Sequence, residues 1–345
     1  MNMRTKNIVA VAALGVAALL AAPSGGSAAD RPSGGNAADR IVFGTDWRAQ
    51  AEHGGFYQAL AAGLYRDRGL DVIIRQGGPQ INHSLLLAAG RVDFSLSSTS
   101  FMVLNYVKQS IPMVAVAAMF QKDPQVLIAH PGQGNNRLKA LKGKPVYIGS
   151  DTRVGSWQFL KSRFGYTDDQ IRPYTFSIAP FLANKNVIQQ GYLGSEPFLI
   201  ERQGIKPVVM MLADAGYSGY AALLQTSRML VDERPKLVRR FVEASIEGWY
   251  DYLFGDPARG NALIKFDNPD MSDELLAYGR RMLVEHEILH SGDAARLGIG
   301  AMNDNRWRKF HRIMSRQGLY PRKMDYRQGF LLRFVNKRVG LKRQR

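Results

Sequence analysis

The sequence predicts an α/β protein built of two lobes, with a mostly helical C-terminal part. From residue 40 onward, short β-branched runs alternate with helical stretches, a pattern typical of sheets whose strands are joined by crossover helices. The alternation begins again after the Gly- and Asn-rich bend at residues 132–136, and a chain of 345 residues is long enough for about two domains. Beyond residue 233 the pattern is almost wholly helical.

The first half of the chain shows a clear alternation of strand and helix patterns. Strands are predicted at residues 40–45, 70–75, 92–96, 113–118 and 125–129, with helices at 54–68, 81–89 and 101–109. In the first of these helices, Phe56, Leu60 and Leu64 recur every fourth residue and therefore share one face, and Gly69 is expected to end it.

The second half repeats this alternation before it becomes helical. Strands are predicted at residues 145–149, 172–176, 207–212 and 220–225, with helices at 156–164, 181–190, 196–203, 233–253, 257–266, 272–289 and 303–317. The strand at 220–225 is expected to return the chain to the first lobe. No period of 20–50 residues repeats, which argues against a solenoid.

The composition excludes several classes of site. The chain has no cysteine, so it cannot contain disulfides, thiolate metal centres or a cysteine nucleophile. Apolar residues make up 46% of the chain and aromatic residues 10%, which is enough to build cores and argues against global disorder.

The first residues are typical of a targeting signal. Arg4 and Lys6 precede an apolar run at residues 8–22, and small residues follow it. The run is shorter than the ~20 residues that a membrane span needs, so residues 1–29 are predicted to be a cleavable signal peptide. Residues 30–39 are interpreted as a disordered leader, and the mature protein is expected in the periplasm.

The positive charge is concentrated at the C-terminal end. Of the formal net charge of +17, the segment 306–345 contributes most, because it holds 14 Lys and Arg residues and one acid, Asp325. A nucleic-acid-binding fold usually spreads such charge over the domain itself, so no nucleic-acid partner is predicted. Residues 321–345 are interpreted as a basic tail that could meet an acidic partner or anionic lipid, stay solvated, or pack on the body.

Few catalytic or metal-binding motifs stand out in the sequence. It has no Gly-x-Ser-x-Gly and no Walker-type loop, and Glu285, His286, Glu287 and His290 together resemble a ligand cluster. His286 and His290 would lie one helical turn apart, but an exposed face with charged neighbours explains them. We therefore predict no catalytic residue, no metal and no cofactor.

Several short segments in the first two hundred residues resemble a known family of binding proteins. The segments are Thr45-Asp46-Trp47, Ala51-Glu52-His53-Gly54-Gly55-Phe56-Tyr57-Gln58-Ala59, Gly63-Leu64-Tyr65, Gly69-Leu70-Asp71-Val72, Ala89-Gly90-Arg91-Val92-Asp93-Phe94 and Leu141-Lys142-Gly143-Lys144-Pro145-Val146. Their order is similar to that in the substrate-binding proteins of ABC importers, of the nitrate/sulfonate/taurine and thiamine-pyrimidine-precursor type. The resemblance covers roughly residues 41–249.

This resemblance implies a two-lobed, hinged periplasmic binding fold of type II. Lobe one is expected at residues 40–125 and 220–320 and lobe two at 126–219. The implied function is non-catalytic: a monomer would capture a pyrimidine or related heterocyclic vitamin precursor and deliver it to an ABC permease in the inner membrane, by hinge closure around the ligand. An aliphatic sulfonate, taurine or nitrate is the alternative ligand.

Five candidate ligand contacts lie in lobe one. Trp47 follows the first strand, where an indole could stack on a flat ring, and His53 precedes a helix and can offer a ring nitrogen. Tyr57 opens that helix. Ser98 and Thr99 join a strand end to a helix start, where hydroxyl groups and free backbone N–H groups bind acceptors.

Five more candidates lie in lobe two. Arg153 could pair with a carboxylate or phosphate, Gly155 permits close approach of the backbone, and Ser156 follows it. Tyr192 precedes Glu196, which in the resembled family is an acidic residue that faces the ligand. A carboxylate at Glu196 would accept hydrogen bonds from an aminopyrimidine and repel an anion, so it favours a neutral or cationic heterocycle.

Two other function classes compete with a receptor. Fungal relatives of this fold make the thiamine pyrimidine with a cysteine-rich segment and iron; the lack of cysteine and the signal peptide argue against such an enzyme here. The basic tail would instead suit a protein that attaches to polyanions or to a membrane surface.

Overall fold

The computed structural model describes residues 38–78, 81–149 and 152–344. The predicted signal peptide and nearly all of the predicted leader lie outside this range. Within it, no helix combines the length and the apolar character that a membrane span requires.

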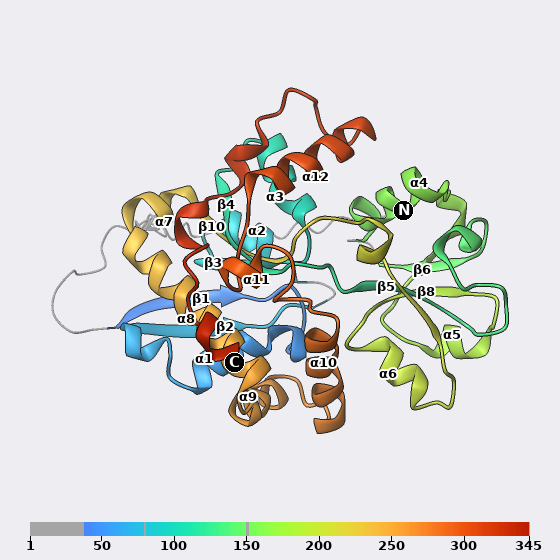
Figure 1. The fold of residues 1–345 in the computed structure, drawn as a ribbon, viewed down its shortest axis with the longest axis horizontal. Helices are drawn as coiled ribbons and strands as arrows, with labels where there is room; N and C mark the ends of the chain where they lie inside the picture. The colour runs from blue at the N-terminus through green and yellow to red at the C-terminus, as the bar shows by residue number, and fades with distance from the viewer. Residues whose placement is uncertain (1–37, 79–80, 150–151, 345) are drawn as a thin grey trace, which may run out of the picture. The chain divides into compact units, whose positions relative to one another are not determined.

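The first sheet has the strand order β2-β1-β3-β10-β4 (Figure 1). Its strands are β1 (Asp39–Gly44), β2 (Leu70–Arg75), β3 (Phe94–Ser97), β4 (Met113–Phe120) and β10 (Ala221–Ser227). β1 pairs in parallel with β2 and β3, whereas β10 is antiparallel to β3 and β4. The helices of the chain's first part are α1 (Gly54–Ala61), α2 (His83–Ala88) and α3 (Ser100–Lys108).

The second sheet repeats this arrangement with the order β7-β6-β8-β5-β9. Its strands are β5 (Gln125–Ala129), β6 (Val146–Ile148), β7 (Ile171–Pro173), β8 (Ile188–Tyr192) and β9 (Val208–Met211), and its helices are α4 (Ser156–Phe164), α5 (Ala179–Ala183) and α6 (Glu196–Glu201). β6 is parallel to β7 and β8, and β5 is antiparallel to β8 and β9. The chain therefore crosses from the first sheet to the second after β4 and returns before β10.

The rest of the chain is helical and packs on the first sheet. It contains α7 (Arg228–Glu233), α8 (Pro235–Phe254), α9 (Ala258–Asp267), α10 (Asp273–Glu285), α11 (Ala294–Leu297) and α12 (Asp304–Arg316). α8 crosses α1 closely, since a Cβ added at Gly248 would lie 2.2 Å from the carbonyl oxygen of Gly55. The α/β class and the helical C-terminal part are confirmed.

The basic C-terminal segment is folded against the body of the protein. Three short 3₁₀ turns follow α12, at η7 (Tyr326–Gly329), η8 (Leu332–Phe334) and η9 (Leu341–Gln344). Phe330, Phe334 and Val335 are buried in the main core, and the N–H of Leu331 donates to the carbonyl oxygen of Ala115 in β4 at 2.9 Å. Because β4 is an edge strand, this segment covers a row of backbone groups that would otherwise face water.

Several predicted elements differ from the structure. The helix expected at 181–190 is wrong: α5 stops at Ala183, the side chain of Asn184 accepts from the N–H of Asn186, and the chain then forms β8. The helix expected at 54–68 ends early, because Gly63 has a φ of 76° and turns the backbone out of the helix. β1 also starts at Asp39, inside the predicted leader.

Candidate functional site

The described residues of the two sheets line two adjoining cavities, with volumes of about 100 Å³ and about 480 Å³. The residues common to both linings are Asp46, Trp47, Leu96, Ser98, Gln125, Thr152 and Phe176. The loops that supply most of the lining follow the carboxyl ends of the parallel strands β1, β3, β6 and β8. Ligands bind at this position in open α/β sheets, so the cavities form the candidate binding cleft.

A hydrogen-bonded group from the first sheet forms one side of the cleft. His53 Nε2 lies 2.9 Å from Asp46 Oδ1, and the hydroxyl group of Ser98 donates to Asp46 Oδ2 at 2.7 Å. Burial opposes ionisation of Asp46, but the hydrogen bond and charge of His53, with the Ser98 bond, outweigh it and lower the pKa of Asp46. Asp46 is therefore an anion held by its neighbours, and the other His53 nitrogen, Nδ1, is buried without a partner in the described structure.

An aromatic pair links the loops of the two sheets. The rings of Trp47 and Phe176 have centroids 4.4 Å apart, and Tyr174 lies 5.0 Å from Phe176. Phe176 is 41% exposed and has a φ of 63°, which costs energy for a bulky side chain and is found mostly where function requires it. The pair presents flat apolar faces to both cavities.

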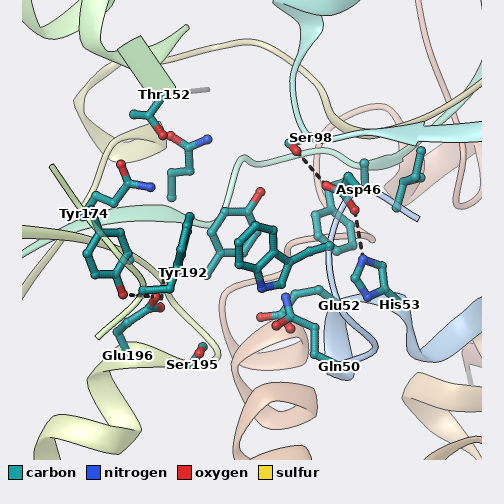
Figure 2. Close-up of a pocket in the computed structure, with 18 residues that line it drawn as sticks. Asp46, Gln50, Glu52, His53, Ser98, Thr152, Tyr174, Tyr192, Ser195 and Glu196 are labelled. Atoms are coloured by element: carbon teal, nitrogen blue, oxygen red, sulfur yellow. Dashed lines mark hydrogen bonds and ion pairs between the residues drawn. The ribbon is translucent and has the colours of Figure 1, made fainter. Parts of the chain in front are cut away.

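Glu196 begins α6 on the opposite side of the cleft, and both of its oxygens have partners. Oε1 accepts from the hydroxyl group of Tyr174 at 2.9 Å, and Oε2 accepts from the backbone N–H of Tyr192 at 2.8 Å. Burial raises the pKa of Glu196 despite these bonds. Figure 2 shows the Glu196–Tyr174 pair on one side, the Asp46–His53–Ser98 group on the other, and Glu52 between them.

Glu52 brings to the cleft a buried carboxyl oxygen that lacks a hydrogen-bond partner in the described structure. It lies in η1 (Ala51–His53), is 4% exposed and lines the smaller cavity. Its Oε1 has no hydrogen-bond partner among the described residues. Burial, helped by the charges of Glu196 and Asp46, raises the pKa of Glu52 to about 7, although a backbone hydrogen bond and the charge of His53 oppose the shift. An unpartnered buried carboxyl is costly, and a ligand that donates a hydrogen bond would relieve that cost.

The structure brings eight of the ten predicted contacts to the cleft. They are Trp47, His53, Ser98, Thr99, Gly155, Ser156, Tyr192 and Glu196. The hydroxyl group of Ser156 donates to Gln125 Oε1 at 2.6 Å, so part of this set also holds the lining together.

Tyr57 and Arg153 lie outside the lining, which corrects those two predictions. Tyr57 is 1% exposed and donates its hydroxyl hydrogen to Asp267 Oδ2 at 2.7 Å, because α1 turns its first residues toward α9 rather than toward the cleft. The side chain of Arg153 is exposed, and the backbone carbonyl of Arg153 accepts from Gln158 on the surface of α4.

Sequence reasoning missed several lining residues. Asp46 and Glu52 stood inside the segments that carry the family resemblance but were not chosen, and Gln125 had no signal beyond its place in a strand. Tyr174 and Phe176 were assigned to a strand, whereas β7 ends at Pro173 and both aromatic residues follow it. Residues 286–290 match the zinc motif His-Glu-x-x-His, which the sequence analysis overlooked, but they follow the end of α10 at Glu285 instead of lying on a helix. No cluster of three metal-ligating side chains is found there or elsewhere among the described residues.

Two five-stranded sheets with two crossings define the fold class of periplasmic binding proteins. The family model described as NMT1/THI5 like matches residues 50–259, and this chain belongs to that family.

Individual relatives are distant in sequence. The riboflavin-binding protein RibY of Chloroflexus aurantiacus is 23% identical over 288 residues, which are 81% of each chain. Among solved structures, the aliphatic sulphonate-binding protein SsuA of Escherichia coli aligns with a TM-score of 0.60 at 13% identity, covering 84% of this chain and 91% of its own. The desulfurization enzyme DszB aligns with a TM-score of 0.56 at 12% identity, covering 89% of this chain and 100% of its own. These structural likenesses show a shared fold.

Proposed function

We propose that this protein is an extracytoplasmic solute receptor that binds a pyrimidine or a related heterocyclic vitamin precursor and delivers it to an ABC permease. The observation that carries the proposal is the lining of the cleft: an aromatic pair and three carboxyl groups, with no lysine or arginine among the described residues. A flat ring can stack on Trp47, and its N–H groups can donate to the carboxylates. The name of the Chloroflexus relative, a riboflavin-binding protein, supports a flat heterocyclic ligand.

The cleft suits an anion poorly. A sulfonate or nitrate would bring a fixed negative charge beside Asp46, Glu52 and Glu196 in a partly buried space, where like charges repel strongly. Arg153, which could have offset that charge, lies outside the lining. The structural likeness to sulphonate-binding proteins therefore concerns the fold and does not favour a sulfonate ligand for this protein.

A receptor is also favoured over an enzyme. The DszB neighbour demonstrates that this fold can support an enzyme, but a chain without cysteine has no thiol nucleophile to offer. The test compares the ligand before and after incubation at equilibrium: stoichiometric recovery of unchanged ligand is expected, and turnover would overturn the receptor assignment. We place the protein in the periplasm as a monomer, consistent with the predicted signal peptide at residues 1–29.

Trp47→Ala should weaken binding of a flat ligand by about 1–3 kcal/mol, because stacking on an indole is lost. This is about 5- to 150-fold in Kd and can be measured by titration calorimetry with an aminopyrimidine and with riboflavin. Phe266→Ala is the matched control, since Phe266 is 84% exposed and lies outside both linings. Equal affinities of wild type and Trp47→Ala would count against stacking.

Glu52→Gln should discriminate between the ligand classes. It removes an acceptor charge, so binding of amino-bearing heterocycles should fall about tenfold, the value of a hydrogen bond to a charged group, while taurine and nitrate remain non-binders. Arg153→Gln is the control and should change neither class. If taurine or nitrate bound to wild type and Arg153→Gln abolished that binding, the anion alternative would replace our proposal.

A further inference from the structure

The basic residues at the C-terminal end fall into two groups that differ in their partners. In the last part of the chain, Arg327, Arg333, Lys337 and Arg343 each pair with a carboxylate of the preceding body. These pairs fasten the segment to the first lobe and explain why those positions are basic. Arg306 of α12 is likewise explained, because it donates to the carbonyl oxygens of Ser218 and Gly219. The exposed cations of α12 and of the turn after it lack such an explanation.

The second group forms a patch that we call the α12 basic face. It consists of Arg308, Lys309, Arg312, Arg316, Arg322 and Lys323, all exposed. None of the six forms an ion pair with any residue in the described ranges. In particular, the acid at the start of the helix, Asp304, pairs with Arg327 instead.

The inner face of α12 holds the basic face in place. Trp307, Phe310, His311 and Met314 are buried against the first lobe. His311 Nε2 lies 3.2 Å from the carbonyl oxygen of Pro321, which places the turn with Arg322 and Lys323 beside the helix. The burial of these side chains fixes the rotation of α12 about its axis and so keeps its cations on the exposed side.

The cations repel one another in the free protein. Arg308, Arg312 and Arg316 are spaced four residues apart, so their side chains lie on one stripe, where like charges destabilise a helix. A negative surface that lies against the stripe would relieve this repulsion, as dissolved salt does in part. A protein partner would be expected to need apolar anchors at the centre of its contact, but none of the exposed large hydrophobic residues belongs to this face.

We propose that the α12 basic face adsorbs to anionic phospholipid headgroups. Clusters of lysine and arginine bind such surfaces electrostatically, without insertion, and lose the interaction as salt rises. The proposal rests on the proposed function in one respect, namely that a receptor for a membrane permease works beside a bilayer. Adsorption would keep the receptor near the membrane between deliveries.

The test is co-sedimentation of the full chain with vesicles of equimolar phosphatidylglycerol and phosphatidylcholine. Wild type should bind at low salt, release at high salt, and ignore vesicles of phosphatidylcholine alone. Neutralising four positions of the face is expected to weaken binding roughly a thousandfold. This variant combines Arg308→Gln, Lys309→Gln, Arg312→Gln and Arg316→Gln.

A charge-matched control separates the face from the net charge. It combines Lys139→Gln, Arg163→Gln, Lys185→Gln and Lys206→Gln, all exposed positions of the second lobe. Equal losses in both variants, no binding by wild type, binding that salt leaves unchanged, or stronger binding to a DNA duplex than to vesicles would each overturn the proposal. The salt response of wild type tests it even if a variant fails to fold.

Solute binding is measured on the same samples and keeps the two proposals apart. Neither set of substitutions touches the cleft, so both variants should bind an aminopyrimidine or riboflavin as wild type does. Solute binding without vesicle binding would sink the basic-face proposal alone, and the reverse would sink the solute proposal alone.

Discussion

Gly248→Val should lower the free energy of unfolding by about 3 kcal/mol, at the upper end of what overpacking costs. A Cβ at this position would lie 2.2 Å from the carbonyl oxygen of Gly55 and 2.5 Å from the Cβ of Ala59. The first of these atoms belongs to the backbone of α1 and cannot move by a change of rotamer. The substitution must therefore push α1 and α8 apart along their crossing.

Valine also has a higher helix propensity than glycine, but this stabilising effect is too small to offset the overpacking. Glycine in a helix interior is about 1 kcal/mol less favourable than alanine, and valine recovers only part of that difference. Urea unfolding of the variant should show the loss directly. Gly78→Val is the control, because its nearest neighbour beyond the adjacent residues is Arg48 Cγ at 3.9 Å, and it should change stability by less than about 0.5 kcal/mol. Higher stability of Gly248→Val would contradict the close α1–α8 packing.

The same crossing explains why fold and site depend on each other. α1 follows η1, which holds Glu52 and His53, and Gly55 packs against Trp249 of α8. A displaced α1 would shift both cleft residues. We therefore expect Gly248→Val to weaken solute binding as well as stability.

The elements with an unambiguous periodic pattern were predictable from the sequence. The bounds of β2, β5 and α4 match the predicted ranges, because each has a regular pattern of apolar residues and ends at a glycine, a proline or another turn residue. β8 was missed because its core positions include Gln189, a polar residue that is fully buried. Burial of a glutamine depends on tertiary packing, which no local pattern reveals.

The site was predictable where a residue follows a predicted strand end or matches the resembled family. Trp47 and Ser98 satisfied the first rule and Glu196 the second, and all three line the cleft. Phe176 reaches the cleft through a left-handed backbone conformation after a three-residue strand, and the free acceptor of Glu52 follows from the packing of two lobes around it. Neither property has a sequence signal.

The dependence of stability on pH is the second large effect that we expect. Burial raises the pKa of both Glu52 and Asp123 to about 7, so the folded protein keeps protons that the unfolded chain releases near pH 4–4.5. The native state thus binds more protons than the unfolded state between those values, and stability falls as pH rises through this window. The shift of Glu52 from 4.5 corresponds to roughly 3 kcal/mol at 1.36 kcal/mol per pKa unit.

On the acidic side of the curve, stability changes with pH in the opposite direction: it falls as pH falls. The pKa of Asp39 is lowered: burial works against this, and the ion pairs with Arg234 and Arg240 outweigh it. The pKa of Asp46 is lowered as well: burial opposes the shift, and the hydrogen bonds of His53 and Ser98, with the charge of His53, outweigh it. Both groups stabilise the protein above their unfolded pKa values, and that contribution is lost as pH falls below about 4. Stability should therefore be highest near pH 4–4.5 and lower at pH 8.

Glu52→Gln and Asp123→Asn should each flatten the alkaline side of this curve. At pH 8 either variant is expected to be more stable than wild type by about 3–4 kcal/mol, and at pH 4 the difference should nearly vanish, as urea unfolding at both pH values can measure. Asp169→Asn, at an exposed position, should leave the curve unchanged. If the stability of wild type did not change between pH 5 and pH 8, the raised pKa values of the two buried carboxyl groups would be refuted. The unpartnered Oε1 of Glu52 therefore destabilises the protein at neutral pH. A solute that donates a hydrogen bond to this oxygen binds partly because it removes that destabilisation.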